Sequence, residues 1–346
     1  MMKNKIDKLK DIVKNNFADS LLLYSKHPNH KWLLETKLDN SIIIIKRTGK
    51  PIIIKSSLEN FDSDNFKIVD IKNRKNYLTN LIKNCGKVTC VDFSRFTLIQ
   101  KKVLKRVKLI DVRKELSALR KIKDKKELDN IKKACKHTTK CFNLLVKQIK
   151  KFKHEQDIIN FIKHYALENN LELAFDTIAA SGINATVPHH SHPSKLKKGF
   201  CVIDFGFDYK GYKSDMTRTV YLGKPTKVEK EIYDLVVSIQ ERLIPLAIDN
   251  TQAKELDIAA RIMFGQYKKY FTHSLGHGLG LEIHEAPYLR SESKNVLREN
   301  QVITIEPGLY DKTKKIGIRI EDSLIVKKGK PIVLTKDATK KLIEIK

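Results

Sequence analysis

The sequence contains few cysteines, and none of them forms a closely spaced pair. Its 346 residues include five cysteines, an odd number, and no Cys-x-x-Cys pattern occurs. Domains held together by disulfides or by thiolate-bound zinc need cysteines at paired spacings, so the sequence argues against both classes. Reduced thiols are the simplest interpretation, and we therefore expect a cytoplasmic protein.

Long apolar segments are also absent. The most apolar runs are SIIIIK at 41–46 and PIIIK at 51–55, far shorter than the ~20 residues that cross a bilayer as a helix. The N-terminal stretch MMKNKIDKLKDIVKNN carries a charge every two or three residues, unlike the apolar centre of a signal peptide. We expect no membrane partner and no secretion signal.

Acidic residues are scarce beside the basic ones. The chain has 40 Asp and Glu against 68 Lys and Arg, which gives a formal net charge of +28. Such a balance can indicate binding to nucleic acid or anionic lipid. The lysines, however, are spread along the whole chain among acidic residues, and no aromatic-interleaved RNA motif or zinc finger occurs. We interpret the charge as a compositional bias and do not predict a nucleic-acid partner.

Hydrophobic periodicity divides the chain into two parts. Residues 1–118 mix strand and helix signals, including a hairpin pattern at 41–57, and are predicted to form a small α/β lobe. Residues 119–346 alternate amphipathic helices with paired strands. Capping boxes at Asp124 and Thr226 open two of these helices, and two more are expected at 155–170 and 253–270. The prediction is an α+β protein with domains 1–118 and 119–346.

Two aspartates lie in strand-like segments where apolar residues are expected. The stretch CVIDFGFDYKGYKSDMTRTVYLG (201–223) reads as two strands around a turn, with Asp204 in the first and Asp215 in the second. A turn centred on Tyr209–Lys210 would place the two carboxylates opposite each other, roughly 5 Å apart at Cβ. Because adjacent buried carboxylates repel, a cation between them is expected. Thr217 would share their face as a supporting hydrogen-bond partner.

A second pair of carboxylates follows the same pattern near the C-terminus. QVITIEPGLY (301–310) carries Glu306, and KIGIRIEDSLIV (315–326) carries Glu321. A turn within the polar segment DKTKK would let these two glutamates face each other across a hairpin. Alternation then places Arg319 on the face of Glu321 and Asp322 on the opposite face.

A glycine-rich segment supplies imidazoles to the same centre. FTHSLGHGLGLEIHEAP (271–287) contains His273, His277 and His284, and its glycines argue against the helical H-E-x-x-H zinc motif. Glycine does let backbone and imidazole approach a crowded centre closely. Four carboxylates and one imidazole carry too much negative charge for a single ion, so we expect two divalent cations. Oxygen-rich ligation favours manganese, iron or cobalt.

Taken together, these segments resemble the pita-bread metallopeptidases, which include prolidases, Xaa-Pro aminopeptidases and methionine aminopeptidases, with creatinase as a relative. The matching motifs occur in family order over roughly residues 120–330: FDTIAASGINATVPHH, VIDFGFDYKGYKSDMTRT, HSLGHGLGLEIHEAP, ITIEPGLY and GIRIEDSLIV. An N-terminal lobe of this size resembles that of prolidases and Xaa-Pro aminopeptidases. The resemblance implies a C-terminal pita-bread domain preceded by a smaller creatinase-type α/β domain.

The resemblance also implies a distribution of the metal ligands. Asp204 would bind one metal, and His277 with Glu306 would bind the other. Asp215 and Glu321 would bridge the two. Manganese or cobalt is the implied metal, with iron or zinc as alternatives.

Further residues are implied around these ligands. His189 and His284 would face the substrate and polarise the peptide, although the adjacent His190 is an alternative to His189. His273 and Arg319 would support these histidines. In the implied mechanism a metal-activated hydroxide attacks the scissile carbonyl, and Glu306 passes the water's proton to the departing amine.

The leading hypothesis is a prolidase-type Xaa-Pro dipeptidase that acts on small peptides, with a homodimer implied by the resemblance. An Xaa-Pro aminopeptidase that acts on longer peptides is the alternative. A non-catalytic peptide-binding pita-bread module and a creatinase-like amidinohydrolase are further possibilities. All five ligand positions are filled, which argues against both of these.

Overall fold

The computed structural model describes residues 2–346. The chain divides into two compact units, Met1–Arg120 and Lys121–Lys346, and each is described by itself. No helix in the described part of the chain is long and apolar enough to cross a membrane.

The N-terminal unit is built on a six-stranded sheet with the order β4-β3-β2-β1-β5-β6. Only β2 runs antiparallel to its neighbours. The predicted hairpin at 41–57 is confirmed by the pairing of Ile42 with Ile54. The strands are β1 (Ser20–Tyr24), β2 (Ser41–Lys46), β3 (Ile52–Ser56), β4 (Lys67–Ile71), β5 (Val88–Val91) and β6 (Lys108–Asp111). The helices are α1 (Met2–Asn15), α2 (Pro28–Leu34), α3 (Arg74–Cys85), α4 (Leu98–Val103) and α5 (Arg113–Lys121).

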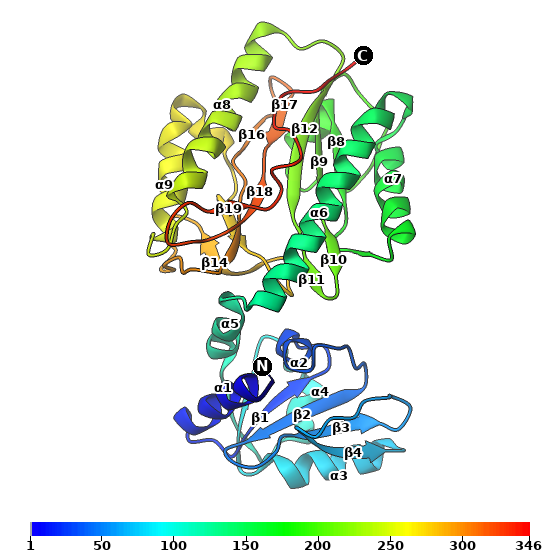
Figure 1. Cartoon of the computed structure of the whole chain (residues 1–346), viewed down its shortest axis with the longest axis vertical. Helices are drawn as coiled ribbons and strands as arrows, with labels where there is room; N and C mark the ends of the chain where they lie inside the picture. Colours follow the sequence, from blue (N-terminus) through cyan, green and yellow to red (C-terminus); the bar gives the residue numbers. More distant parts are fainter. Residues whose placement is uncertain (1) are drawn as a thin grey trace. The chain divides into compact units, whose positions relative to one another are not determined.

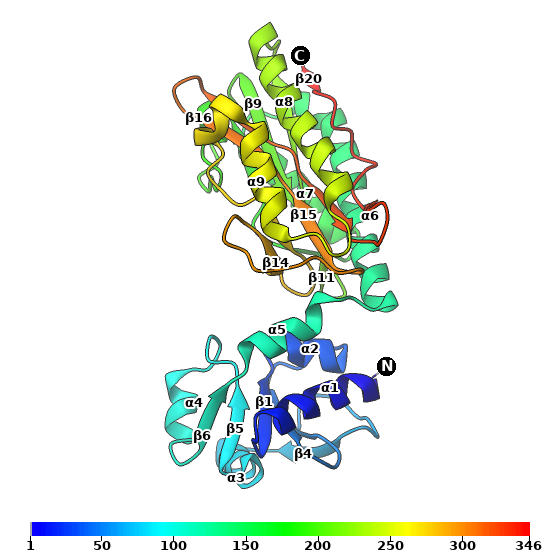
Figure 2. The same cartoon turned by 90° about the vertical axis from the view of Figure 1, so that its left-hand side faces the viewer.

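The C-terminal unit contains four long helices: α6 (Lys125–Gln148), α7 (Glu155–Glu168), α8 (Lys227–Leu243) and α9 (Ala253–Met263). Both predicted capping boxes are present, at Asp124 and at Thr226. Within this unit α6 and α7 lie on one side of the strands, and α8 and α9 lie on the other (Figure 1). Figure 2 shows α8 and α9 packed in front of the strands.

The predicted helix at 253–270 was too long. The α-helix ends at Met263, and a 3-10 segment follows at Gly265–Tyr270. Gly265 adopts a positive φ of 51°, which interrupts α-helical geometry.

Strands from both halves of this unit form its centre. One sheet has the order β20-β12-β9-β8 and another the order β14-β13-β15-β18-β19, while β11-β10-β7 and β16-β17 form smaller sheets. The strands are β7 (Glu172–Leu173), β8 (Ile178–Ser181), β9 (Gly199–Phe205), β10 (Phe207–Tyr209), β11 (Tyr212–Lys213), β12 (Met216–Leu222), β13 (Gly276–Gly278), β14 (Glu285–Leu289), β15 (Val302–Ile305), β16 (Gly308–Asp311), β17 (Ile316–Arg319), β18 (Asp322–Ile325), β19 (Ile332–Val333) and β20 (Glu344–Ile345).

The predicted register of the aspartate hairpin was wrong by two residues. Asp204 pairs with Thr217 and not with Asp215. The turn is centred on Lys210–Gly211, whose φ values of 55° and 92° are both positive. A two-residue hairpin loop of this kind needs positive φ at both central residues, and glycine adopts such a φ without strain. A shift of two keeps every side chain on its face of the sheet. Asp215 is therefore a diagonal neighbour of Asp204 on the same face.

The predicted register of the glutamate hairpin is confirmed on both sides of the two glutamates. Gly308 pairs with Arg319, and Ile305 pairs with Asp322. Glu306 and Glu321 lie between these two ladders, where the regular pairing is interrupted. Their backbone N–H groups donate elsewhere, to the carbonyl oxygens of Leu275 and Thr217 respectively.

Candidate metal centre

The five residues expected to bind metal come from five separate segments and line one cavity of about 730 Å³. Asp204 lies in β9, Asp215 just before β12 and His277 in β13. Glu306 follows β15, and Glu321 precedes β18. All are buried except Glu306, whose side chain is 16% exposed. The hairpins and the glycine-rich segment therefore meet at one point.

His277 is oriented to act as a ligand. Its Nδ1 lies 3.1 Å from the carbonyl oxygen of Gly278, so the proton on Nδ1 is donated to the backbone. The lone pair of Nε2 then faces the carboxylates, with Glu306 Oε1 at 3.3 Å and Asp215 Oδ2 at 3.6 Å. Burial, with a contribution from His284, lowers the pKa of His277 to about 3. A neutral imidazole with one nitrogen fixed by the backbone is the form that binds metals.

The carboxylates are crowded enough to hold protons when no cation is present. Burial first, and then the charge of Glu321, raises the pKa of Asp215 well above its ordinary range. Burial and the charge of Glu306 do the same to Glu321. Burial raises the pKa of Glu306 to about 8, although Arg319 opposes the rise. Removing this repulsion requires either protons or cations.

Two carboxylates each keep one oxygen fixed by the protein and one oxygen free. Glu321 Oε2 accepts a hydrogen bond of 2.7 Å from Thr217 Oγ1, and Asp204 Oδ2 accepts one of 2.7 Å from Arg319 Nη2. Their other oxygens, Glu321 Oε1 and Asp204 Oδ1, are buried and have no hydrogen-bond partner among residues 2–346. An unpaired buried carboxylate oxygen is costly. Ligand atoms of Asp215, His277 and Glu321 also lie within 4.8 Å of one another. The residues present fit divalent cations.

Arg319 and Thr217 orient two of the carboxylates that are expected to bind metal, Asp204 and Glu321. Besides Asp204, the guanidinium of Arg319 donates to Thr217 Oγ1 at 3.1 Å and to the Tyr310 hydroxyl at 2.7 Å. Thr217 in turn donates to Glu321. One buried arginine therefore links the aspartate hairpin to the glutamate hairpin. Tyr310 was not singled out from the sequence, because a tyrosine in an apolar strand carries no distinctive signal.

The other predicted histidines, His189, His273 and His284, also line the cavity. His273 contacts the Tyr310 hydroxyl through Nε2 at 2.9 Å, and burial, reinforced by Arg319, lowers its pKa to about 3. The His284 ring lies 4.3 Å from the His277 ring, edge to face. Burial and the neighbouring His189 lower the pKa of His284. A lowered pKa favours the neutral imidazole, which suits hydrogen bonding to a substrate.

The geometry also separates His189 from His190, although both line the cavity. His190 Nε2 lies 2.8 Å from the carbonyl oxygen of His192 and 3.7 Å from Glu155 Oε2. The polar contacts of this ring are therefore made with residues other than the five expected metal ligands. His189 is close enough to His284 and His273 to influence the pKa of both. This arrangement favours His189 as the substrate-facing histidine.

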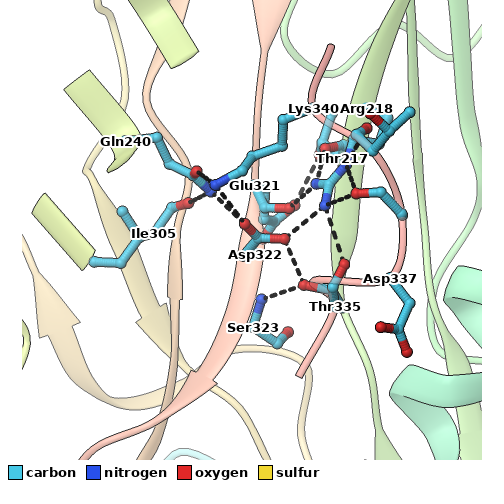
Figure 3. A network of polar contacts seen from close by, with 12 residues as sticks. Thr217, Arg218, Gln240, Ile305, Glu321, Asp322, Ser323, Thr335, Asp337 and Lys340 are labelled. Carbon is cyan, nitrogen blue, oxygen red and sulfur yellow. Dashed lines mark hydrogen bonds and ion pairs between the residues drawn. The ribbon is translucent and has the colours of Figure 1, made fainter. Parts of the chain in front are cut away.

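A buried polar network contacts the backbones of Glu321 and Asp215 on the side of the hairpins that faces away from the cavity (Figure 3). Arg218 is 1% exposed and donates to the backbone carbonyl of Glu321. It also forms an ion pair of 2.6 Å with Asp322, which accepts a hydrogen bond of 3.0 Å from Gln240. Ser323 Oγ donates to the backbone carbonyl of Asp215 at 2.7 Å. The backbones of the two ligands expected to bridge the metals are thus fixed from the opposite face of the hairpins.

Asp322 lies on the opposite face, as its position in the strand predicts, whereas Arg218 was not singled out from the sequence. The available signal was the alternation of TRT in an apolar strand, which puts a charged residue between two site-facing threonines. A buried charge at such a position needs a buried partner. The matching position was Asp322.

Comparison with known proteins places the chain in a family. The model of metallopeptidase family M24 matches residues 129–328. The Xaa-Pro dipeptidase of Pyrococcus horikoshii is 33% identical over 97% of this chain and 98% of that protein. The Xaa-Pro dipeptidase of Pyrococcus furiosus is 40% identical over 66% of each chain.

Solved structures match the fold of nearly the whole chain. The prolidase from Pyrococcus horikoshii has a TM-score of 0.89 at 31% identity and covers 98% of this chain and 100% of its own. An Xaa-Pro dipeptidase from Bacillus anthracis has a TM-score of 0.91 at 27% identity, with 99% and 100% covered. An X-Pro aminopeptidase from Thermotoga maritima has a TM-score of 0.87 at 28% identity, with 98% and 100% covered.

These matches confirm the predicted architecture, a pita-bread domain preceded by a smaller creatinase-type domain. The family model spans more than half of the chain, and one relative matches almost all of it. The protein therefore belongs to metallopeptidase family M24 and is an enzyme with peptidase activity.

Proposed function

We propose that this enzyme is a dinuclear metallopeptidase that hydrolyses Xaa-Pro bonds, with Xaa-Pro dipeptides as its preferred substrates. Relatives named Xaa-Pro dipeptidase support the substrate, one of them over nearly the full length of both chains. The observation that carries the chemistry is the pair of buried carboxylate oxygens of Asp204 and Glu321 that the protein leaves free in one cavity.

The five ligands would share two cations. Asp204 would hold one, His277 and Glu306 the other, and Asp215 and Glu321 would contact both. When bound, divalent cations supply Lewis acidity and lower the pKa of a water to about 7. We propose manganese or cobalt, because oxygen ligands outnumber nitrogen and no thiolate lines the cavity among the described residues. Iron and zinc are the alternatives.

The chain's own groups would move the proton and orient the substrate. Glu306 lies on the cavity wall beside His277, where it would accept the proton of the attacking water and deliver it to the proline nitrogen as the bond breaks. The imidazoles of His189 and His284 would donate hydrogen bonds to the carbonyl oxygen as it gains negative charge. Arg319 would keep Asp204 ionised and oriented through its 2.7 Å hydrogen bond.

Proline constrains how such a site reads its substrate. An Xaa-Pro bond has no N–H, because the proline nitrogen carries the ring. The site must therefore recognise the ring and the carbonyl groups, and amide hydrogen bonding to the scissile bond contributes nothing.

An assay on peptides of two lengths tests the proposed substrate. Purified protein loaded with Mn²⁺ or Co²⁺ is given an Xaa-Pro dipeptide and the matching Xaa-Pro-Yaa tripeptide. We expect cleavage of the dipeptide with the higher kcat/KM. Cleavage of tripeptides and longer chains only would replace the dipeptidase by an Xaa-Pro aminopeptidase, an activity for which the matching fold of the Thermotoga maritima enzyme is the supporting observation.

A homodimer and a cytoplasmic location stay predictions from the sequence. Light scattering on the purified protein tests the first, and a mass of about twice 39.9 kDa is expected.

A further inference from the structure

Strand β8 ends a sheet beside the candidate metal centre. The sheet order β20-β12-β9-β8 leaves one side of β8 without a strand partner, and Figure 1 shows β8 next to β9. Along the shared side, Ile178 pairs with Asp204 and Ser181 pairs with Cys201. The open side of β8 therefore runs directly past a residue expected to bind metal.

The backbone groups on the open side can be assigned from one hydrogen bond. The N–H of Ser181 donates to Glu155 Oε1 at 2.6 Å and so points away from β9. In an antiparallel pair every second residue points its N–H and C=O outward. Ala179 must therefore direct these groups to the open side, whereas Ala180 bonds to β9. We assign Thr177, which directly precedes β8, to the same side by extending the alternation. Nothing in the described part of the chain bonds to the outward groups of Thr177 and Ala179.

This open edge lines the same cavity as the candidate metal centre. Thr177 and Ala179 lie on the cavity wall together with Ile159 and Lys163 of α7. They are only 9% and 2% exposed, and the hydroxyl oxygen of Thr177 is buried without a partner among residues 2–346. Buried backbone groups and hydroxyls that lack partners are rare because each costs free energy. The cavity therefore holds polar groups that a ligand can satisfy.

We propose that the free edge of β8 binds the main chain of the peptide substrate by adding it as a short extra strand. This inference rests on the proposed peptidase function and adds a binding subsite to it. The N–H of Ala179 would donate to a carbonyl or carboxylate oxygen of the substrate, and the outward carbonyls of Thr177 and Ala179 would accept from its amino or amide groups. Pairing with Glu155 closes the edge at Ser181, so the substrate enters from the Thr177 end.

Edge pairing explains how a peptidase can hold a substrate whose scissile bond lacks an N–H. Main-chain hydrogen bonds supply affinity that does not depend on the residue before proline. They also fix the depth of the substrate in the cavity, because Ile178, between the two edge residues, is paired with Asp204.

A proline substitution at the edge tests the proposal. Proline is tolerated on an edge strand where its N–H faces outward, so Ala179→Pro removes the proposed donor without removing a bond to β9. We expect KM for the best Xaa-Pro substrate to rise about tenfold, the loss of one hydrogen bond, with unchanged Mn²⁺ content and circular dichroism.

A folded, metal-loaded Ala179→Pro variant with wild-type kcat/KM contradicts the edge proposal. Failure of the wild-type enzyme to cleave any Xaa-Pro peptide contradicts the proposed function instead, and the edge is then tested with whichever peptide is cleaved.

Hydrogen exchange on the wild-type metal-loaded enzyme provides a second test, in case the proline variant does not fold. The probe is an Xaa-Pro dipeptide analogue in which a CH group replaces the proline nitrogen, so that the carbonyl is kept but the bond cannot be hydrolysed. We expect the probe to slow exchange at the amides of Thr177 and Ala179. The amide of Ala180, already bonded to β9, serves as the control. Unchanged exchange at Ala179 with saturating probe overturns the proposal.

Discussion

Asp204 and Glu321 each use one carboxylate oxygen for the protein and leave the other to the cavity. The fixed oxygens are held by Arg319 and Thr217, and the free ones are buried without partners in the described chain. A carboxylate held in this way is oriented before any cation arrives. Preorganised ligands of this kind bind metal without the cost of first ordering the site.

Replacing Asp215, which we propose contacts both cations, should strongly reduce activity without unfolding the protein. In Asp215→Asn an amide replaces the carboxylate whose ligand atom lies within 4.8 Å of those of His277 and Glu321. Because loss of a partner outside the ligand shell already costs 10–100-fold in affinity or activity, we expect at least about a 100-fold loss of turnover and reduced bound Mn²⁺. Asp234→Asn, an exposed position on α8, is the matched control. Near-wild-type turnover in Asp215→Asn would refute the assignment.

Metal binding should release protons near neutral pH. In the metal-free protein burial raises the pKa of Glu306 to about 8, and burial with the neighbouring carboxylates raises the pKa values of Asp215 and Glu321 well above their ordinary range. With a pKa of about 8, Glu306 is mostly protonated at pH 7, so a cation that binds there must displace its proton. We expect affinity for Mn²⁺ to increase with pH through 8.

Calorimetric titrations with Mn²⁺ in buffers of different ionisation enthalpy measure this proton release at pH 7. The apparent binding enthalpy should change with the buffer. An enthalpy that is the same in every buffer means that no proton leaves, and contradicts the predicted protonation.

Several residues of the site could be predicted because a charge in an apolar strand is conspicuous. The four carboxylates found in this way, Asp204, Asp215, Glu306 and Glu321, all line one cavity in the structure. The choice between His189 and His190 could not be made, because adjacent residues in a loop have no periodicity that fixes their direction.

At the scale of the elements, the two carboxylate hairpins differ in how well their turns could be located. The glutamate hairpin has the register that its spacing indicates. The aspartate hairpin turns at Lys210–Gly211, where both residues have positive φ, one residue later than predicted. The error left the face of Asp215 unchanged, since the side-chain period of a strand is two. The face of the sheet on which a side chain lies could therefore be predicted more securely than the residue that it pairs with on the neighbouring strand.

The network behind the hairpins should couple stability to metal affinity. Arg218→Lys keeps the positive charge but removes the planar guanidinium, which donates hydrogen bonds to Asp322, to the backbone carbonyl of Glu321 and to the backbone carbonyl of Ala338 at the same time. A buried acceptor left without its hydrogen bond costs about 1–3 kcal/mol. We expect a lower free energy of unfolding and about 10–100-fold weaker Mn²⁺ binding.

Urea denaturation and Mn²⁺ titration measure these two effects of Arg218→Lys. Arg242→Lys, on the exposed side of α8, is the control and should change neither. Loss of stability with wild-type metal affinity would show that the network is structural only.

At the scale of the whole molecule, the family model and the chemistry both belong to the C-terminal unit. The match to family M24 covers residues 129–328, whereas the unit Met1–Arg120 lies outside it. The relatives that match the full length include both units. The fold class could be predicted from periodicity and motif order. The net charge of +28 is spread over the chain and indicates no site.

The N-terminal unit should lose stability in acid through a buried histidine. Burial lowers the pKa of His30 to about 4, and its Nε2 lies 2.9 Å from Ser41 Oγ. A histidine kept neutral by burial stabilises the folded state above the unfolded pKa of about 6.5, and this stability is lost as the pH falls toward 4. The expected loss for His30 is roughly 2 kcal/mol by pH 5.

Hydrogen exchange on the full chain at pH 7 and pH 5 measures the stability of each unit. His30→Gln should reduce the loss in the N-terminal unit, whereas exposed His164→Gln should not. Equal acid sensitivity of His30→Gln and the wild type contradicts this prediction.

A metal titration of the stripped enzyme tests the central claim most directly. The protein is freed of metal with a chelator, Mn²⁺ is added in known amounts, and the hydrolysis rate of an Xaa-Pro dipeptide is measured beside that of the matching Xaa-Ala dipeptide. We predict that activity on Xaa-Pro rises until two equivalents of Mn²⁺ are bound per chain and exceeds activity on Xaa-Ala. Full activity at one equivalent, or no preference for proline, would contradict a dinuclear Xaa-Pro peptidase.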